Sequence, residues 1–275
     1  MSATSTRRKA LVASMLGVAA AAAGVRADAS QPRPHDIAMT QVRYKTVDVD
    51  GLSIFYREAG PPGAPAVLLL HGFPSSSHMF RDLIPRLAER YRVVAPDYPG
   101  FGHSAFPARE DFTYSFASIT GVIDRFAQTI GLARYALYIQ DYGAPVGLRL
   151  ALLHPERVST LVVQNGNAYE EGLSGDWDPL KAYWKSPTAE NRAKLRGWLS
   201  PAGTQLQYTA GLPAALRDRL SPDTWTLDWA LLSRPGNIDL QLDLFGDYQT
   251  NVALYPRFQD YLRRYQPPTL VVWGR

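Results

Sequence analysis

The sequence predicts an α/β fold in which a mostly parallel sheet is covered by helices on both faces. Short apolar runs such as 65–70 are typical of central parallel strands. These runs alternate with segments whose apolar residues recur at helical spacing. A long stretch from about 166 to 250 has no strand pattern, which indicates a helical insertion in the α/β core.

The elements follow one another in a regular order. Segments 41–49 and 52–57 form a hairpin around the Asp50–Gly51 turn, and buried strands then alternate with helices. The expected strands are 41–49, 52–57, 65–70, 91–95, 135–140, 158–164 and 267–273. The expected core helices are 78–90, 117–131, 144–153 and 252–265. The core therefore has two parts, 36–165 and 252–275, separated by the insertion 166–251.

The insertion 166–251, called the cap below, is rich in aromatic residues. It holds five of the chain's six Trp. Helices are expected near 188–199, 213–220 and 222–232. Aromatic side chains at this density fit the lid of an apolar pocket, or equally the core of a small helical layer. The candidates for the pocket are Trp177, Tyr183, Trp184 and Tyr208, with Tyr169 as a further tyrosine of the cap.

Residues 1–29 have the composition of a secretory signal peptide. Arg7, Arg8 and Lys9 precede an Ala-rich apolar run, and Ala27 and Ala29 are spaced as in a cleavage site. The paired arginines also loosely match a twin-arginine signal, so we expect export, to the periplasm, and no stable membrane anchor after cleavage. An uncleaved anchor or a leader without structure is the alternative.

The charge balance and the cysteine count exclude several classes of partner. Residues 1–29 hold four basic and one acidic side chain of the chain's 29 basic and 25 acidic ones, so the remainder is nearly neutral. We therefore expect no nucleic-acid partner. The chain has no Cys, and no spacing of His with carboxylates indicates a metal site. We expect neither a metal nor another cofactor, and a small apolar molecule as the partner.

Asp141 lies at a sharp turn between the strand 135–140 and the helix that follows Gly143. A side chain at such a turn stands above the sheet edge, near the unpaired N–H groups of the helix N-terminus. Attack of a carboxylate on an ester carbonyl gives a reactive anhydride, whereas attack on saturated carbon gives an alkyl ester that water can cleave. Asp141 therefore indicates displacement at a carbon–halogen or epoxide carbon. An acidic helix cap is the alternative that the turn alone leaves open.

Residues 40–275 resemble the α/β-hydrolase superfamily, and within it the haloalkane dehalogenase and epoxide hydrolase branch. The resemblance rests on three motifs in the right order: H-G-F-P at 71–74, G-F-G-H-S at 100–104 and Q-D-Y-G at 140–143. It implies that Asp141 is the nucleophile and that the backbone N–H groups of Phe73 and Tyr142 form the oxyanion hole. It also implies that His71 is structural, with its ring hydrogen-bonded beneath the loop.

The catalytic acid and base are less well matched. In one dehalogenase group the catalytic acid follows the strand that comes after the helix 144–153. The corresponding position in this sequence is Glu171, next to Glu170. In other members an acid follows the strand that here ends at Trp273, and a solvated loop charge is the alternative for both glutamates. The family's base is a His beyond that strand, and none of the chain's five His matches it. We therefore expect a C-terminally incomplete chain that lacks the last strand and helix and leaves the strand ending at Trp273 as an uncovered apolar edge.

The sequence thus predicts a hydrolase that forms an alkyl ester on Asp141. A haloalkane is the favoured substrate because Ile139 and Gln140 before the nucleophile resemble dehalogenases, although Tyr142 and Phe73 replace halide-binding Trp and Asn. An epoxide is the alternative, with cap tyrosines protonating the alkoxide. A chain without a base would instead be inactive, bind apolar molecules or trap one alkyl group. A serine esterase is disfavoured because the turn between the strand 135–140 and the following helix carries Asp141 and no Ser.

Overall fold

A computed structural model describes residues 40–274. Its sheet has seven strands in the order β1-β2-β4-β3-β5-β6-β7. β1 and β2 form the antiparallel hairpin, β2 pairs antiparallel with β4, and all pairs from β4 to β7 are parallel. The predicted α/β class with a mostly parallel sheet is confirmed. The strands are β1 (Arg43–Val49), β2 (Leu52–Ala59), β3 (Ala66–Leu70), β4 (Arg92–Pro96), β5 (Tyr135–Gln140), β6 (Val158–Gln164) and β7 (Thr269–Val272).

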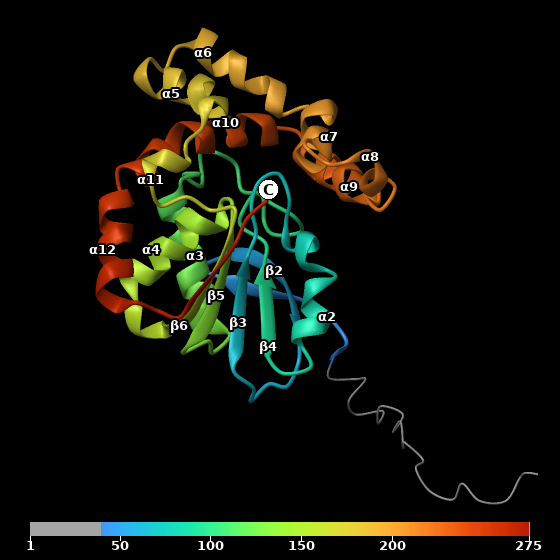
Figure 1. The fold of residues 1–275 in the computed structure, drawn as a ribbon, viewed down its shortest axis with the longest axis vertical. Helices are drawn as coiled ribbons and strands as arrows, with labels where there is room; N and C mark the ends of the chain where they lie inside the picture. The colour runs from blue at the N-terminus through green and yellow to red at the C-terminus, as the bar shows by residue number, and fades with distance from the viewer. Residues whose placement is uncertain (1–39, 275) are drawn as a thin grey trace, which may run out of the picture. The chain divides into compact units, whose positions relative to one another are not determined.

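Alternate residues of the central strand β3 face the two covered sides of the sheet. Leu68 and Leu70 belong to the larger hydrophobic cluster, whereas Val67 and Leu69 pack with Ile84 in a separate one. This explains why β3 reads as a continuous apolar run. Figure 1 shows the helices on both faces. They are α3 (Phe116–Thr129), α4 (Gly143–Leu153) and α12 (Tyr255–Tyr265) on one side and α2 (Leu83–Leu87) on the other.

The helix expected over 78–90 is not continuous. The structure has a short 3-10 helix η1 (Ser77–Phe80) and then α2, with Arg81 and Asp82 between them. Pro85 is the physical reason, because its ring would clash with the carbonyl of Arg81 in an unbroken helix and it has no N–H to donate. The prediction of one helix here was wrong.

The cap is helical, and the described chain has no strand between β6 and β7. In Figure 1 the cap helices lie beyond the carboxyl ends of the parallel strands, which is where Asp141 emerges. Four of them, α5, α7, α10 and α11, were not expected from the sequence. The cap helices are α5 (Asp178–Lys185), α6 (Ala189–Lys194), α7 (Pro201–Thr209), α8 (Ala214–Arg217), α9 (Asp223–Leu232), α10 (Asn237–Asp247) and α11 (Gln249–Val252), with the 3-10 helices η3 (Glu170–Gly172), η4 (Gly175–Trp177) and η5 (Leu195–Trp198) and, before the cap, η2 (Pro155–Arg157).

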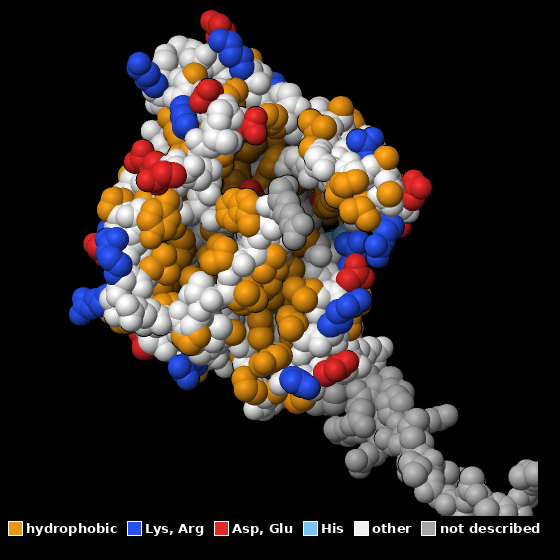
Figure 2. All heavy atoms as spheres, viewed as in Figure 1, with side chains coloured by type: hydrophobic (Ala, Val, Ile, Leu, Met, Phe, Trp, Pro, Cys, Tyr) orange, Lys and Arg blue, Asp and Glu red, His pale blue; other side chains and the backbone are white. Residues whose placement is uncertain are grey.

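The last strand exposes its side chains, as expected for an uncovered apolar edge. Leu270 is 58% exposed and Trp273 just after the strand is 54% exposed. Figure 2 shows hydrophobic side chains gathered on the face that carries this end of the chain. No helix within residues 40–274 has the length and hydropathy needed to cross a membrane. The predicted signal segment 1–29 lies outside the described residues.

Candidate active site

The turn between β5 and α4 holds Asp141 in a strained conformation. Its φ is +48°, in the left-handed region that few side chains adopt, and α4 begins at Gly143. A Cβ atom on Gly143 would lie 2.2 Å from the carbonyl oxygen of Leu70, so only glycine allows the turn to approach β3 this closely. The turn therefore has the geometry of a nucleophile elbow.

Two backbone N–H groups hold one oxygen of the Asp141 carboxylate. Phe73 N donates to Oδ1 at 2.7 Å and Tyr142 N donates to the same atom at 2.6 Å. These are the two N–H groups that the sequence predicts for the oxyanion hole. Burial raises the pKa of Asp141 to about 6, and the two N–H donors oppose that rise. Both of these hydrogen bonds go to Oδ1, and none is found to Oδ2 within residues 40–274.

The loop after β3 presents Phe73 because its two ends are tied to the core. Asp97, which is fully buried, accepts hydrogen bonds from the backbone N–H of Ser77 at 2.7 Å and of His103 at 2.9 Å. His71 Nε2 accepts from Tyr98 N at 3.2 Å, and burial lowers the pKa of this imidazole to about 4. His71 thus lies beneath the loop as a neutral hydrogen-bonding group, in agreement with the structural role expected for it.

Asp141 opens into a cavity of about 720 Å³ between the core and the cap. This is within the range of roughly 300–1,000 Å³ that is usual for small-molecule sites. Figure 2 shows the molecule hollowed beneath the cap, with hydrophobic side chains in the hollow. The wall is mostly apolar, and its bulky side chains are Phe73, Tyr142, Trp177, Leu180, Trp198, Leu206, Phe245 and Tyr248.

The sequence-based pocket candidates have different positions. Trp177 lines the cavity. Trp184 does not line the cavity. Its indole N–H donates to the carbonyl of Phe245 at 2.8 Å. Tyr183 accepts a hydrogen bond from Arg192 at 3.4 Å, and Tyr208 donates to another cap residue, so neither hydroxyl faces Asp141.

The two acid candidates lie away from the cavity. Glu170 and Glu171 form the start of the 3-10 helix η3, and both side chains are exposed. Neither lines the cavity that holds Asp141. Among residues 40–274 no histidine lines it either. The described residues thus bring together Asp141, the predicted nucleophile, and the two N–H donors, but no acid–base pair.

The sequence did not indicate three further wall residues. Trp198, Phe245 and Tyr248 line the cavity, and the last two come from α10 and the residue after it. Tyr248 is 4% exposed, and burial, followed by the neighbouring Tyr255 and Asp141, raises its pKa well above the usual value. Its phenol therefore stays protonated in the cavity wall. Its ring lies parallel to that of Trp184, with centroids 6.1 Å apart.

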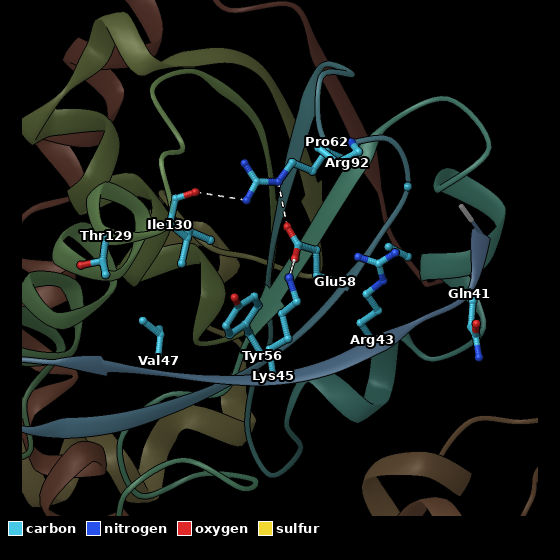
Figure 3. A pocket seen from close by; sticks show the side chains of 12 residues that line it. Gln41, Arg43, Lys45, Val47, Tyr56, Glu58, Pro62, Arg92, Thr129 and Ile130 are labelled. Atoms are coloured by element: carbon cyan, nitrogen blue, oxygen red, sulfur yellow. Dashed lines mark hydrogen bonds and ion pairs between the residues drawn. The ribbon is translucent and has the colours of Figure 1, made fainter. Parts of the chain in front are cut away.

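A second hollow of about 470 Å³ lies at the β1–β2 hairpin and shares no residue with the first. Figure 3 shows its charged centre, where Glu58 lies between Lys45 and Arg92. The Glu58 oxygens lie 2.5 Å from Lys45 Nζ and 2.8 Å from Arg92 Nε, and Arg92 also donates to the carbonyl of Ile130 at 3.1 Å. Because these groups satisfy one another and no nucleophile accompanies them, this hollow is not the candidate active site.

Comparison with known proteins identifies hydrolases as the relatives of this chain. Residues 65–275 match the family model described as the alpha/beta hydrolase fold. An uncharacterized hydrolase of Saccharomyces cerevisiae is 47% identical over 237 residues, which cover 84% of this chain and 80% of that protein. A haloalkane dehalogenase of Mycobacterium marinum is 41% identical over 121 residues, 43% of this chain and 40% of that protein.

Solved structures agree on the fold. A mutant of the haloalkane dehalogenase DatA from Agrobacterium tumefaciens has a TM-score of 0.65 at 23% identity, over 84% of this chain and 78% of that one. Epoxide Hydrolase A from Mycobacterium thermoresistibile has a TM-score of 0.64 at 22% identity, over 86% of this chain and 92% of that one. At these identities the likeness concerns the fold alone.

Proposed function

This chain belongs to the family of proteins with the α/β hydrolase fold, and we propose that it hydrolyses a small apolar substrate through a covalent alkyl ester on Asp141. One observation carries the proposal. The Asp141 carboxylate stands on a strained elbow at the wall of an apolar cavity, with Oδ1 held by the N–H groups of Phe73 and Tyr142.

In the first step, Oδ2 of Asp141 attacks a saturated carbon of the substrate. A C–O bond forms, the bond to the leaving group breaks, and the leaving group takes the electron pair. The apolar wall supports this step because a carboxylate with few hydrogen bonds is a stronger nucleophile than a hydrated one. The two N–H groups hold Oδ1, so the second oxygen points to the substrate.

In the second step, water attacks the carbonyl carbon of the Asp141 ester. Negative charge then develops on the oxygen that Phe73 and Tyr142 already bind, which is where an oxyanion hole acts. Collapse of this intermediate releases the alcohol and restores the carboxylate. A general base must take the proton of the water. We propose that the protein supplies such a base, and we assign it to none of the described residues.

The donors in the cavity wall support an epoxide as the first candidate substrate. Opening an epoxide produces an alkoxide, which needs a proton, and Tyr248 is the candidate donor, because it lines the cavity and its phenol, which also interacts with Tyr255, has a raised pKa and stays protonated. Trp184, one of the two tryptophans that the sequence predicts for the pocket, does not line the cavity and donates its indole N–H to the Phe245 carbonyl. An epoxide is therefore preferred over the haloalkane that the sequence favours.

A haloalkane is the second candidate, and Trp177 supports it. Its indole lines the cavity, its ring centroid lies 4.9 Å from that of Tyr248, and no hydrogen bond within residues 40–274 engages its N–H. Such an indole N–H is a donor to which a departing halide can bind. The mycobacterial dehalogenases that match this chain also favour this substrate.

The experiment compares diol formation from styrene oxide with halide release from 1-bromobutane, using the purified full-length protein. We expect diol formation to exceed halide release, and Asp141→Asn to abolish both. Tyr248→Phe should lower epoxide turnover by about 10- to 100-fold and change bromide release much less, because only the alkoxide needs a proton. Full activity in Asp141→Asn would refute the nucleophile. Faster halide release than diol formation, unaffected by Tyr248→Phe, would favour the second candidate.

A further inference from the structure

The cavity that holds Asp141 has a buried inner wall and an exposed rim. The buried lining residues, none more than 4% exposed, are Tyr142, Leu180, Phe245 and Tyr248. The rim comes from two segments of the cap, 175–179 at the start of α5 and 206–210 at the end of α7. The residues of these segments that line the cavity are all exposed except Trp177. A substrate whose reacting carbon meets Asp141 therefore directs its other end, called the tail below, toward the rim.

Asp176 is the charged residue of the rim. It is exposed, and its side chain makes no hydrogen bond or ion pair with another residue of the described range 40–274. Gln207, on the other segment of the rim, is exposed as well, and its amide is equally without a partner in that range. No Lys, Arg or His among the described residues lines the cavity. The carboxylates of Asp141 and Asp176 are therefore the charged groups of the described wall.

This wall discriminates between substrate tails of opposite charge. A carboxylate tail would leave water for a wall that offers it no cation, and both aspartates would repel it. A cationic tail at the exposed rim keeps part of its hydration and is attracted by the Asp176 carboxylate. An uncharged tail is subject to neither effect, and a polar one can form a hydrogen bond with the amide of Gln207. The apolar inner wall accepts the body of the substrate in each case.

We propose that Asp176 is a specificity-determining residue, which makes the cavity favour substrates with an uncharged or cationic tail over substrates with a carboxylate tail. The inference rests on the proposed function, in which Asp141 reacts with a substrate bound in this cavity. It narrows the substrate class from small apolar molecules to those whose end remote from the reacting carbon is neutral or positively charged. Epoxy acids and halogenated carboxylic acids are therefore expected to be poor substrates.

The first experiment measures binding alone, with two unreactive ligands that share a benzyl group, benzyltrimethylammonium and phenylacetate. Quenching of tryptophan fluorescence in the full-length protein reports both affinities, because Trp177 and Trp198 line the cavity. The wild type should bind the cation more tightly. Asp176→Asn should lower the cation-to-anion affinity ratio about tenfold at low salt, because an exposed charge contributes about threefold for each sign of ligand. Gln207→Lys places a cation on the rim and should lower the ratio at least as much.

Glu190→Gln is the matched control, because it removes one exposed carboxylate from the same cap. Glu190 does not line the cavity, and it pairs with Lys194 at 2.8 Å. The control should keep the affinity ratio of the wild type, because solvent and salt screen a charge that lies away from the ligand. A wild type that binds phenylacetate as tightly as the cation, or an unchanged ratio in both Asp176→Asn and Gln207→Lys, would refute the role of Asp176.

The second experiment measures turnover and separates this role from the proposed function. Its substrates are styrene oxides that carry a methylene-linked trimethylammonium or carboxylate group in the para position. The ratio of their kcat/KM values should fall in Asp176→Asn, as the affinity ratio does. Turnover through an Asp141 adduct without any charge preference would refute the role of Asp176 and leave the proposed function standing. A charge preference in binding that Asp176→Asn removes, without an Asp141 adduct from any epoxide or bromoalkane, would refute the proposed function and support charge selection at the rim.

Discussion

Replacing Asp141 by Asn should stabilise the protein as it abolishes the reaction, and the gain should grow with pH. Asn fits the left-handed turn as well as Asp does, so the change removes the charge with little effect on the backbone. Burial raises the pKa of Asp141 from 3.8 to about 6, so ionisation costs more in the folded than in the unfolded protein. Below pH 3.8 both states are protonated and the variant gains nothing from the missing charge.

The magnitude follows from the two pKa values. Folding stability of the wild type falls as pH rises through the window between them, by about 1 kcal/mol at pH 4.5 and about 3 kcal/mol at pH 8 relative to the Asn variant. The second figure is an upper value, because Asp141 lines the cavity and is only partly shielded from water. Urea unfolding of both proteins at the two pH values measures the difference. A gap that stays constant between pH 4.5 and pH 8 would refute a carboxylate destabilised by its elbow.

Four further predictions concern the site and the cap residues around it. Adduct formation on Asp141 should rise about tenfold from pH 5 to pH 7, because a carboxyl group with a pKa of about 6 ionises over that range. Gly72→Ala should lower the adduct rate by at least about 100-fold, because the new Cβ would lie 2.3 Å from Asp141 Cβ and displace the nucleophile; quenched samples analysed by mass spectrometry measure both rates. Trp184→Phe should cost about 1–3 kcal/mol of unfolding free energy by leaving the Phe245 carbonyl without its donor. Trp177→Phe should instead spare stability and reduce halide release more than diol formation; chemical denaturation and the two product assays separate these outcomes.

Much of the fold could be predicted because its signals are local. The run 65–70 is apolar at every position because the two faces of β3 are both covered, and a single sequence displays that directly. The elbow was also recognisable, since Gly143 is required where a Cβ would meet Leu70. The same holds for Phe73 and Tyr142, whose predicted N–H groups do converge on Asp141. Backbone donors depend on the turn alone, so motif spacing was enough to find them.

The cavity wall could not be predicted to the same extent, because it depends on how helices pack. α10 (Asn237–Asp247) alternates polar and apolar residues over much of its length and contains Gly246, a pattern that hides a helix. Tyr248, which follows it, was therefore missed. Trp177 and Trp184 look alike in the sequence, and only the contact with Phe245 shows that Trp184 points away from the cavity. Such differences arise from tertiary contacts.

The most direct test of the central claim is the covalent intermediate itself. The full-length protein would be mixed with 1-bromobutane or styrene oxide, quenched with acid from milliseconds to hours, and analysed by intact mass and peptide mapping. We expect one butyl group, or one hydroxyphenylethyl group, on the peptide that contains Asp141, and none in Asp141→Asn. Turnover without any adduct in the quenched samples, or an adduct on another side chain of the folded protein, would contradict it.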